Sequence, residues 1–411
     1  MPTPAPDDAT IPDSTLKRAR WGVTLLFLTN GLVWANLVPR YPEIRDHAGL
    51  SYGQFGAAVA CGPAGALIFG LGAGWLIRRF TSRMVGIAAT SLMAVAALCA
   101  GLAPTGVALG AALFALGSLD AIADVAQNSH GLRVQRGTGR SMLNGFHATW
   151  SVGAVAGGVI GGISAGLHVP VPAQLAVVGI VIVAGLAFGS RLFIPGPEPV
   201  EPEHAHEPRG MKHVPFRSWA VLIALGFIAI AGVWVEDAGA SWSASYLRDD
   251  LRAGPTIAAM AFVSLMTMHF LGRIFGDRLV DRFGQRAVAR TGGVITIVGM
   301  GAALLFPSVP LTIVGFGLAG LGVATTVPAA MHGADELPGF RTGTGLSIAS
   351  WMLRLGFLIS PPIVGAIADE FGLRAGLLVV PVAGVIIVAL AGVLSNTTLQ
   401  REPRPAEATA G

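Results

Sequence analysis

Long apolar stretches alternate with short polar segments along the whole chain. About 20 apolar residues can cross the roughly 30 Å hydrocarbon core of a bilayer as an α-helix. Barrel strands would alternate with a period of two and would be about half as long. The pattern therefore predicts an all-α membrane protein with twelve transmembrane helices. We expect them at 20–39, 52–77, 84–103, 107–130, 142–167, 171–190, 218–240, 255–277, 287–306, 309–331, 342–368 and 373–395.

The composition supports a membrane location. Hydrophobic residues make up 53% of the chain and charged residues 12%, and the mean hydropathy is +0.66. Soluble domains carry about 25% charged residues, so a soluble class is excluded. No cleavable signal peptide is expected, because the first apolar run is long enough to be a span. Cys61 and Cys99 fall inside expected spans and indicate no disulfide framework.

Positive charge follows the expected topology. With both termini in the cytoplasm, nearly all of the 27 Lys and Arg lie in tails, cytoplasmic loops or cytoplasmic helix ends. The exceptions are Arg40, Arg45, Arg248, Arg252 and Arg374 on the outside and Arg354 within a span. This is the positive-inside pattern. We expect no nucleic-acid partner despite a pI of 9.6, because no basic patch is interleaved with aromatic residues on a soluble domain.

A Pro- and Glu-rich segment separates the sixth and seventh spans, which favours an extended linker. The expected organisation is a tail at 1–16, a six-helix bundle at 17–191, a linker at 192–217, a second bundle at 218–396 and a tail at 397–411. His204 and His206 could bind a metal, but their spacing in a flexible acidic segment favours a solvated linker. We expect no metal site and no cofactor.

The two bundles carry traces of a duplication. A charged turn at Asp277–Arg286 has a damaged copy at Gly74–Arg83, with Arg78 in place of Asp281. Gly157–Gly161 in span five likewise aligns with Pro361–Gly365 in span eleven. In both cases the two copies are separated by nearly the same number of residues, which indicates parallel six-span repeats. This architecture places the substrate site between the halves near mid-membrane.

Glycines recur three or four residues apart in span five. They are Gly153, Gly157, Gly158, Gly161, Gly162 and Gly166. Such spacing lets helix backbones approach closely. The glycines indicate either plain packing or a slidable seam between the halves.

These features resemble the major facilitator superfamily. The turn at Asp277–Arg286 is similar to that family's loop between spans two and three and its echo between spans eight and nine. Span five resembles the family's antiporter-associated motif, with Gly158 where proline is expected. Further strings resemble the MosC-like branch of bacterial inner-membrane permeases: Asn30 to Pro42, Asp124 to Asn128, Gly145 to Ala148, Ala240 to Ser243 and Gly272 to Gly284. The resemblance implies a multi-pass protein of the bacterial inner membrane.

Ionisable groups inside spans cost about 2.5–3.5 kcal/mol or more, so each is a candidate site. Asp120, Asp124 and Asn128 share one helical face of span four. Repulsion and burial both favour the protonated form of paired carboxyls; alternatively, Asp124 caps the helix or pairs with a nearby arginine. Arg354 aligns with Trp150 and needs a partner in the membrane. It either exchanges Asp120 for substrate or proton, or forms a fixed ion pair.

Other polar groups complete the expected pathway. Glu236 could bind a polar ligand near the outer end of span seven, and Asn30 and Trp34 could face the cavity. His147 and His269 either take part in proton coupling or are hydrogen-bonded packing residues. No catalytic arrangement appears, so we do not expect an enzyme.

The charged turns are candidate gates. Asp281 is expected to approach Arg140 and the positive end of span five, which would hold the cytoplasmic side closed. Arg78 would gain nothing from the dipole of span eleven, so the sequence predicts an asymmetric latch carried mainly by the second half. The candidate gating residues are Arg78, Arg83, Arg140, Asp277, Asp281, Arg282 and Arg286.

The sequence therefore predicts a monomeric secondary transporter that works by alternating access on a small polar or amphiphilic solute. Proton coupling is expected, and import of a sugar- or polyol-like compound and export of a metabolite or drug both remain open. A membrane sensor on the same scaffold is the alternative, against which the lack of a substantial soluble domain argues.

Overall fold

The computed structural model describes residues 11–196, 214–340 and 343–395. Within these ranges it contains helices and no strand, and twelve helical segments are long and apolar enough to cross a membrane. The predicted all-α fold with twelve spans is therefore confirmed. His204 and His206 lie outside the described residues.

The first bundle contains six spans. The first is α1 (Asp13–Leu37), continued by η2 (Val38–Arg40) and α2 (Tyr41–His47), and the second is α3 (Tyr52–Phe69) with α4 (Ala73–Phe80). Four unbroken helices follow: α5 (Ser82–Gly101), α6 (Gly106–Thr138), α7 (Leu143–Gly166) and α8 (Val171–Gly189).

The second bundle repeats this order. It consists of α9 (Phe216–Ser245) with η5 (Tyr246–Asp250), α10 (Pro255–Phe283), α11 (Gln285–Leu305), α12 (Val309–Val323) with α13 (Thr326–Asp335), α14 (Thr344–Phe371), and α15 (Leu373–Gly376) with α16 (Val379–Leu390). Several helices are longer than the expected spans. Their polar first and last turns continue beyond the apolar stretch on which the sequence boundaries rest.

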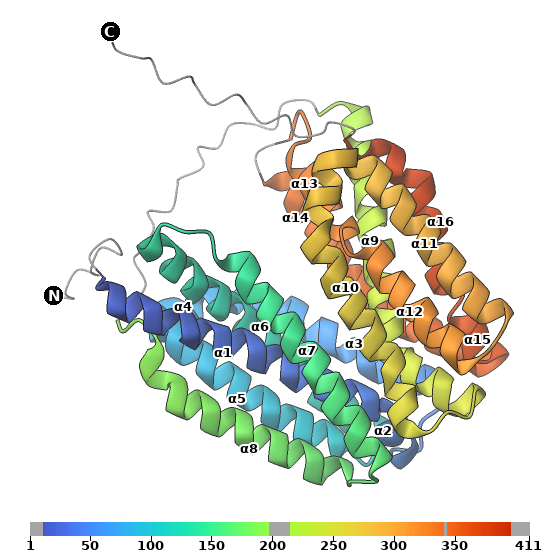
Figure 1. The fold of residues 1–411 in the computed structure, drawn as a ribbon, viewed down its shortest axis with the longest axis horizontal. Helices are drawn as coiled ribbons and strands as arrows, with labels where there is room; N and C mark the ends of the chain where they lie inside the picture. The colour runs from blue at the N-terminus through green and yellow to red at the C-terminus, as the bar shows by residue number, and fades with distance from the viewer. Residues whose placement is uncertain (1–10, 197–213, 341–342, 396–411) are drawn as a thin grey trace.

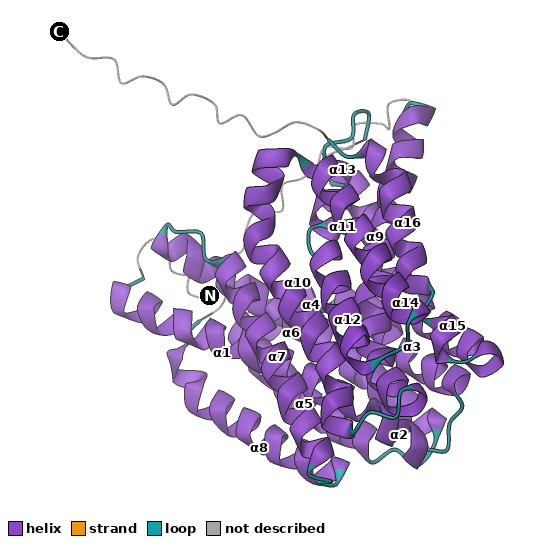
Figure 2. Ribbon diagram, turned by 45° about the vertical axis from the view of Figure 1, so that its right-hand side comes forward, coloured by secondary structure: helices purple, strands orange, loops and turns teal. Residues whose placement is uncertain are grey.

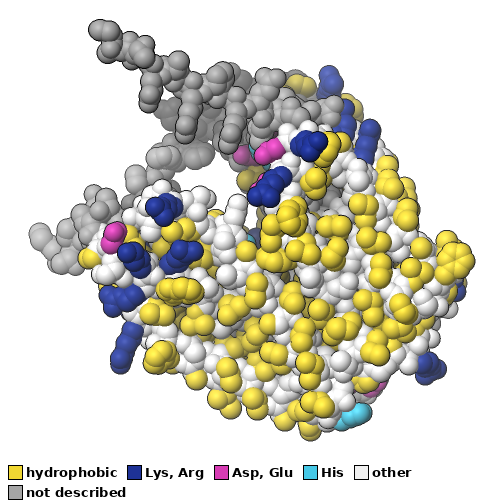
Figure 3. Space-filling view, in the orientation of Figure 1, with side chains coloured by type: hydrophobic (Ala, Val, Ile, Leu, Met, Phe, Trp, Pro, Cys, Tyr) yellow, Lys and Arg dark blue, Asp and Glu magenta, His cyan; other side chains and the backbone are white. Residues whose placement is uncertain are grey.

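The two bundles separate at one end and meet at the other (Figure 1, Figure 2). We call the end at which α1 and α9 begin the terminal face, and the other end the far face. The bundles diverge towards the terminal face, and the space-filling view shows a hollow between them there (Figure 3). Apolar side chains cover most of the visible flank, as a surface against lipid requires, and Lys and Arg gather around the open end.

The duplicated turns have the same backbone. Gly284 ends α10 and begins α11 at φ 82°, and Thr81 takes φ 85° between α4 and α5. Positive φ is cheap for glycine and strained for a β-branched residue. The first copy of the turn has thus lost its glycine as well as its carboxylate, and the Thr81 hydroxyl partly compensates by accepting a hydrogen bond from the Met84 N–H at 3.4 Å.

Candidate functional site

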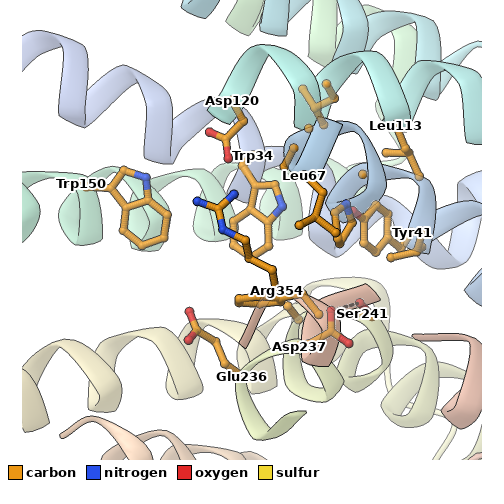
Figure 4. Close-up of a pocket in the computed structure, with 18 residues that line it drawn as sticks. Trp34, Tyr41, Leu67, Leu113, Asp120, Trp150, Glu236, Asp237, Ser241 and Arg354 are labelled. Carbon is orange, nitrogen blue, oxygen red and sulfur yellow. Dashed lines mark hydrogen bonds between the residues drawn. The ribbon is translucent and has the colours of Figure 1, made fainter. Parts of the chain in front are cut away.

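A cavity of about 350 Å³ lies between the two bundles near their middle. The first bundle contributes Trp34, Asp120 and Trp150, and the second contributes Glu236, Asp237 and Arg354 (Figure 4). Much of the remaining wall is apolar and includes Leu67, Leu113, Leu116 and Phe357. A concave, largely apolar site with a few convergent polar groups is the usual form of a small-molecule site.

The first bundle fixes Asp120 through a chain of hydrogen bonds. The Asn30 amide donates to Asp120 Oδ1 at 2.9 Å, and the indole N–H of Trp150 donates to Asn30 Oδ1 at 2.7 Å. Three helices, α1, α6 and α7, therefore set the orientation of one carboxylate. Asn30, the central member of this chain, is 2% exposed and is therefore shielded from water.

The second bundle supplies two further carboxylates from neighbouring positions on α9. Glu236 Oε1 lies 4.0 Å from Nδ1 of the buried His269 on α10. Asp237 accepts a hydrogen bond from the Ser241 hydroxyl at 3.4 Å through Oδ1, and its Oδ2 has no hydrogen-bond partner within the described residues. Each carboxylate keeps acceptor capacity that the described protein atoms do not use.

Arg354 is the single cation of the cavity lining. Its side chain extends from α14 towards Asp120, with Trp34 and Trp150 beside it in this view (Figure 4). The expected pairing with Asp120 is absent from this conformation: Arg354 forms no ion pair or hydrogen bond within the part of the chain that the structure describes. The two groups share one cavity and face each other from opposite bundles.

A second cavity, of about 660 Å³, lies between α7 and the second bundle near the terminal face. Its lining includes His147, Arg273, Asp277 and His332. The structure thus separates the predicted residues into two groups. Asn30, Trp34, Asp120, Glu236, His269 and Arg354 lie at or against the central cavity, and His147 and Asp277 line the outer one.

Asp124 and Asn128 belong to neither lining. The Asn128 amide donates to Asp124 Oδ1 at 2.9 Å, and the Gln127 amide donates to the same oxygen at 3.2 Å. Asp124 is therefore bound within its own helix, one turn closer to the terminal face than Asp120. These contacts are neither a helix cap nor an arginine pair, and a role of Asp124 in proton transfer stays a prediction.

The predicted terminal latch is open. Arg78, Arg83, Arg140, Asp281 and Arg282 form no ion pair within the described residues. Arg286 instead donates to the Leu394 carbonyl at 3.0 Å, which ties the start of α11 to the end of the last span. The separation of the bundles at this face accounts for the missing contacts.

The far face is closed by a carboxylate at a helix N-terminus. Asp369, in the last turn of α14, accepts hydrogen bonds from the backbone N–H groups of Tyr52 and Gly53 at 2.8 and 2.9 Å and from the Ser51 hydroxyl at 2.8 Å. Its charge also meets the positive end of the α3 dipole. The sequence predicts this arrangement for Asp281 at the terminal face and gives no sign of it at Asp369.

Four charges reinforce this closure. Arg45 and Asp46 of α2 meet Arg248 and Asp249 of η5, with cross-bundle distances of 3.0 Å for Arg45–Asp249 and 2.8 Å for Arg248–Asp46. The Tyr52 hydroxyl also donates to Asp249 at 3.0 Å. We refer to Arg45, Asp46, Arg248 and Asp249 as the far-face cluster.

Two further cavity residues were not predicted as site residues, although the sequence holds a signal for each. Asp237 is adjacent to Glu236 and lies one helical turn from its partner Ser241. Trp150 aligns with Arg354 in the duplication, and equivalent positions of two repeats around a pseudo-symmetry axis can line one cavity. No group of three or more metal-ligating side chains occurs in the described ranges.

The chain matches known transporters over nearly its whole length. The sequence profile of the Major Facilitator Superfamily matches residues 23–236 and 222–410. An uncharacterised transporter of Sinorhizobium fredii is 30% identical over 91% of this chain and 98% of its own length. Membrane protein MosC of Rhizobium meliloti is 28% identical over 93% of this chain and 91% of its own length.

A solved structure shares the fold. A bacterial homologue of the human lysosomal transporter Spinster, in an inward-facing and occupied conformation, superimposes with a TM-score of 0.71 at 17% identity, covering 93% of this chain and 97% of its own. Together with the sequence matches, the twelve helices and the cavity between two bundles, this shows that the chain belongs to the major facilitator superfamily, as a membrane transporter of its MosC-like branch.

Proposed function

We propose that this protein is a secondary active transporter that moves a small polar solute by alternating access and couples the movement to protons. The observation that carries the proposal is the central cavity, in which both bundles contribute ionisable groups to one site. A site of this kind suits a solute that must be released when the bundles move apart. The far face is closed and the terminal face is open, which is one of the two end states that alternating access requires.

The orientation follows from charge. Lys and Arg gather around the terminal face (Figure 3), and the positive-inside rule would place that face in the cytoplasm. The proposal is therefore an inward-open monomer in a bacterial inner membrane, with both termini inside. Import and export use the same two conformations, so the proposed function includes transport in either direction.

Asp120 is the proposed proton carrier of the first bundle. It is held by Asn30 inside the cavity, and it faces Arg354 across the site. When the bundles close on the terminal side, the carboxylate either pairs with the guanidinium or takes a proton. Solute binding to Arg354 would prevent the ion pair with Asp120 and would favour protonation of Asp120. Solute binding and proton uptake would thereby be coupled.

The test uses purified protein in liposomes that contain a pH-sensitive dye. Addition of a transported solute is expected to change the internal pH, and Asp120→Asn is expected to abolish that change while binding persists. Glu370→Gln is the matched control, because Glu370 is an exposed acid outside both cavities. Solute movement without any pH change would reject proton coupling, and retained pH changes in Asp120→Asn would reject this carrier.

A further inference from the structure

The charges around the central cavity are of both signs. Asp120, Glu236 and Asp237 supply three carboxylates, and Arg354 supplies the only guanidinium of the lining. The described protein atoms do not neutralise Arg354. A guanidinium that remains unpaired when a membrane cavity closes and loses water is strongly disfavoured, so the closed state requires an anionic group beside it, either Asp120 or a group of the solute.

The carboxylates make the opposite demand. Glu236 and Asp237 are consecutive residues of α9. Glu236 lies 4.0 Å from the ring nitrogen of His269, and Asp237 accepts a hydrogen bond of 3.4 Å from the Ser241 hydroxyl. Both partners leave free acceptor positions on the two side chains. Closure of the cavity therefore favours a ligand that brings donors, and a positive charge among them most of all.

Two of the three carboxylates, Glu236 and Asp237, lie in a different part of the wall from Arg354. In Figure 4 the Arg354 guanidinium lies towards Asp120 and the tryptophans, whereas Glu236 and Asp237 lie below it on α9. A bound molecule can therefore reach both signs only with separate groups at its two ends. At the guanidinium end, Trp34 and Trp150 stack with centroids 6.4 Å apart and an interplanar angle of 24°, which places apolar ring surface beside Arg354 (Figure 4).

We propose that the cavity binds a zwitterionic organic solute, with a carboxylate or similar anion on Arg354 and an ammonium group on the Glu236–Asp237 pair. The inference rests on the proposed transport function and names the substrate class of the same site. An anion alone would satisfy Arg354 and face three carboxylates. A cation alone, or a neutral polyol, would leave Arg354 to pair with Asp120 and would not release that carboxylate to take a proton.

The tryptophan pair adds a preference among zwitterions. The part of the skeleton next to the anionic group lies beside Trp34 and Trp150, so a planar or bulky apolar skeleton binds more tightly than a short polar one. The cavity volume of about 350 Å³ limits the solute to a small molecule.

The test compares matched probes by thermal stabilisation of the detergent-purified protein. Phenylalanine, leucine and proline are each used as the free zwitterion, as the cationic methyl ester and as the N-acetylated anion. Taurine, γ-aminobutyrate, glucose and sorbitol widen the panel. We expect zwitterions to raise the melting temperature, with the single-charge forms of the same skeleton binding at least about tenfold more weakly.

Variants test which cavity residue binds each charged end of the solute. Arg354→Ala is expected to weaken the zwitterion about tenfold or more and to leave its methyl ester unchanged, and Glu236→Gln is expected to weaken the zwitterion and to spare the N-acetyl form. Arg354→Lys, which keeps the charge, should restore part of the affinity. Arg290→Ala, an exposed arginine of α11 outside both cavities, should bind every probe as the parent does.

The proposal is overturned if no zwitterion of the panel stabilises the protein, or if an ester, an N-acetyl form or a neutral polyol binds better than the zwitterions. It is also overturned if Arg354→Ala weakens zwitterion and ester equally. Proton movement with a neutral polyol would keep the transport function and remove this substrate class. Zwitterion binding without proton movement would support this substrate class and reject proton-coupled transport.

Discussion

Trp150 and Arg354 occupy matching positions in the duplicated halves, and both side chains reach the central cavity. The repeat has therefore kept the location of a functional position while its chemistry changed from an aromatic ring to a guanidinium. Trp150 has a second role, because its indole N–H orients Asn30, which in turn binds Asp120. Trp150 therefore orients Asp120 through Asn30, whereas Arg354 faces the same carboxylate from the other bundle without pairing with it (Figure 4).

The hydrogen-bond chain predicts energetic coupling between its members. Trp150→Phe keeps an aromatic ring and removes the donor, and Asn30→Ala removes its acceptor. Trp150→Phe is expected to lower the free energy of unfolding by about 0.5–1.5 kcal/mol for the lost bond, and Asn30→Ala by more, because it also removes the bond to Asp120. The double variant should lose less than the sum, because both changes remove the same interaction.

Denaturant midpoints of the two single variants and the double variant would measure this coupling. Trp34→Phe is the matched control, because Trp34 lines the same cavity and its indole N–H makes no hydrogen bond within the described residues. Trp34→Phe and Asn30→Ala should therefore be additive. Additive losses for Trp150→Phe and Asn30→Ala would contradict the proposed chain.

The sequence identified charged residues that line the cavity, but it could not identify their hydrogen-bond partners. Asp120 and Arg354 stand out because charges inside apolar spans are costly, and both line the cavity. The partners of Asp120 could not be predicted, because Asn30 lies 90 positions away and only the packing of α1 against α6 brings the two together. Asp124 satisfies the same spacing rule as Asp120, yet it binds its own helix.

Helix α7 shows how one glycine-rich segment serves two interfaces. Gly153, Gly157 and Gly161 lie against α1 of the same bundle, whereas Gly158, Gly162 and Gly166 lie against α10 of the other bundle. Packing and the seam between halves therefore both occur, on two faces of one helix. The three- or four-residue spacing predicted close approach, but both rows share that spacing, so the sequence did not assign either row to a partner.

The row that faces α10 should control closure of the far face. A Cβ at Gly162 would lie 2.5 Å from the Cβ of Ala259, so Gly162→Ala forces the two helices apart. Overpacking of this kind costs about 1–3 kcal/mol, and the cost falls only on the state in which α7 and α10 touch. We expect the variant to populate the far-face-open state more than the parent does.

Spin labels at His47 and Ile257, in a background without Cys61 and Cys99, would report the far-face distance by double electron–electron resonance. A longer distance is expected for Gly162→Ala. Gly185→Ala on α8 is the control, since a Cβ there meets no atom within 4 Å. An unchanged distance distribution in Gly162→Ala, or an equal change in both variants, would reject a gating role for this row.

Across the whole molecule, the same short pattern ends helices on both faces. Asp281 to Gly284 reads Asp-Arg-Phe-Gly, and Asp369 to Gly372 reads Asp-Glu-Phe-Gly. Gly284 and Gly372 take φ of 82° and 83°, so both turns have one backbone form. The copy at Asp369 now caps α3 and closes the far face, while the copy at Asp281 stands free of Arg140 at the open face.

This repetition explains what the sequence could predict about gating. The physical device that the sequence predicts for Asp281, a carboxylate on a helix N-terminus, occurs at Asp369. Its predicted location, at Asp281, is a contact of the other end state and stays a prediction. The far-face cluster could not be predicted, because Arg45 and Arg248 read only as outside charges until the two bundles bring them together.

The two aspartates are therefore expected to shift the conformational equilibrium in opposite directions. Asp369→Ala removes three charge-assisted hydrogen bonds from the far-face-closed state, and a loss of about 1.5–3 kcal/mol moves the equilibrium tenfold or more towards the far-face-open state. Asp281→Ala removes its contact from the opposite state and should favour the terminal-face-open state. Spin-label pairs at His47 and Ile257 on the far face, and at Arg79 and Arg290 on the terminal face, would measure both populations in lipid nanodiscs. Glu370→Ala controls for charge next to Asp369, and a shift of both aspartate variants in the same direction would exclude the two-latch mechanism.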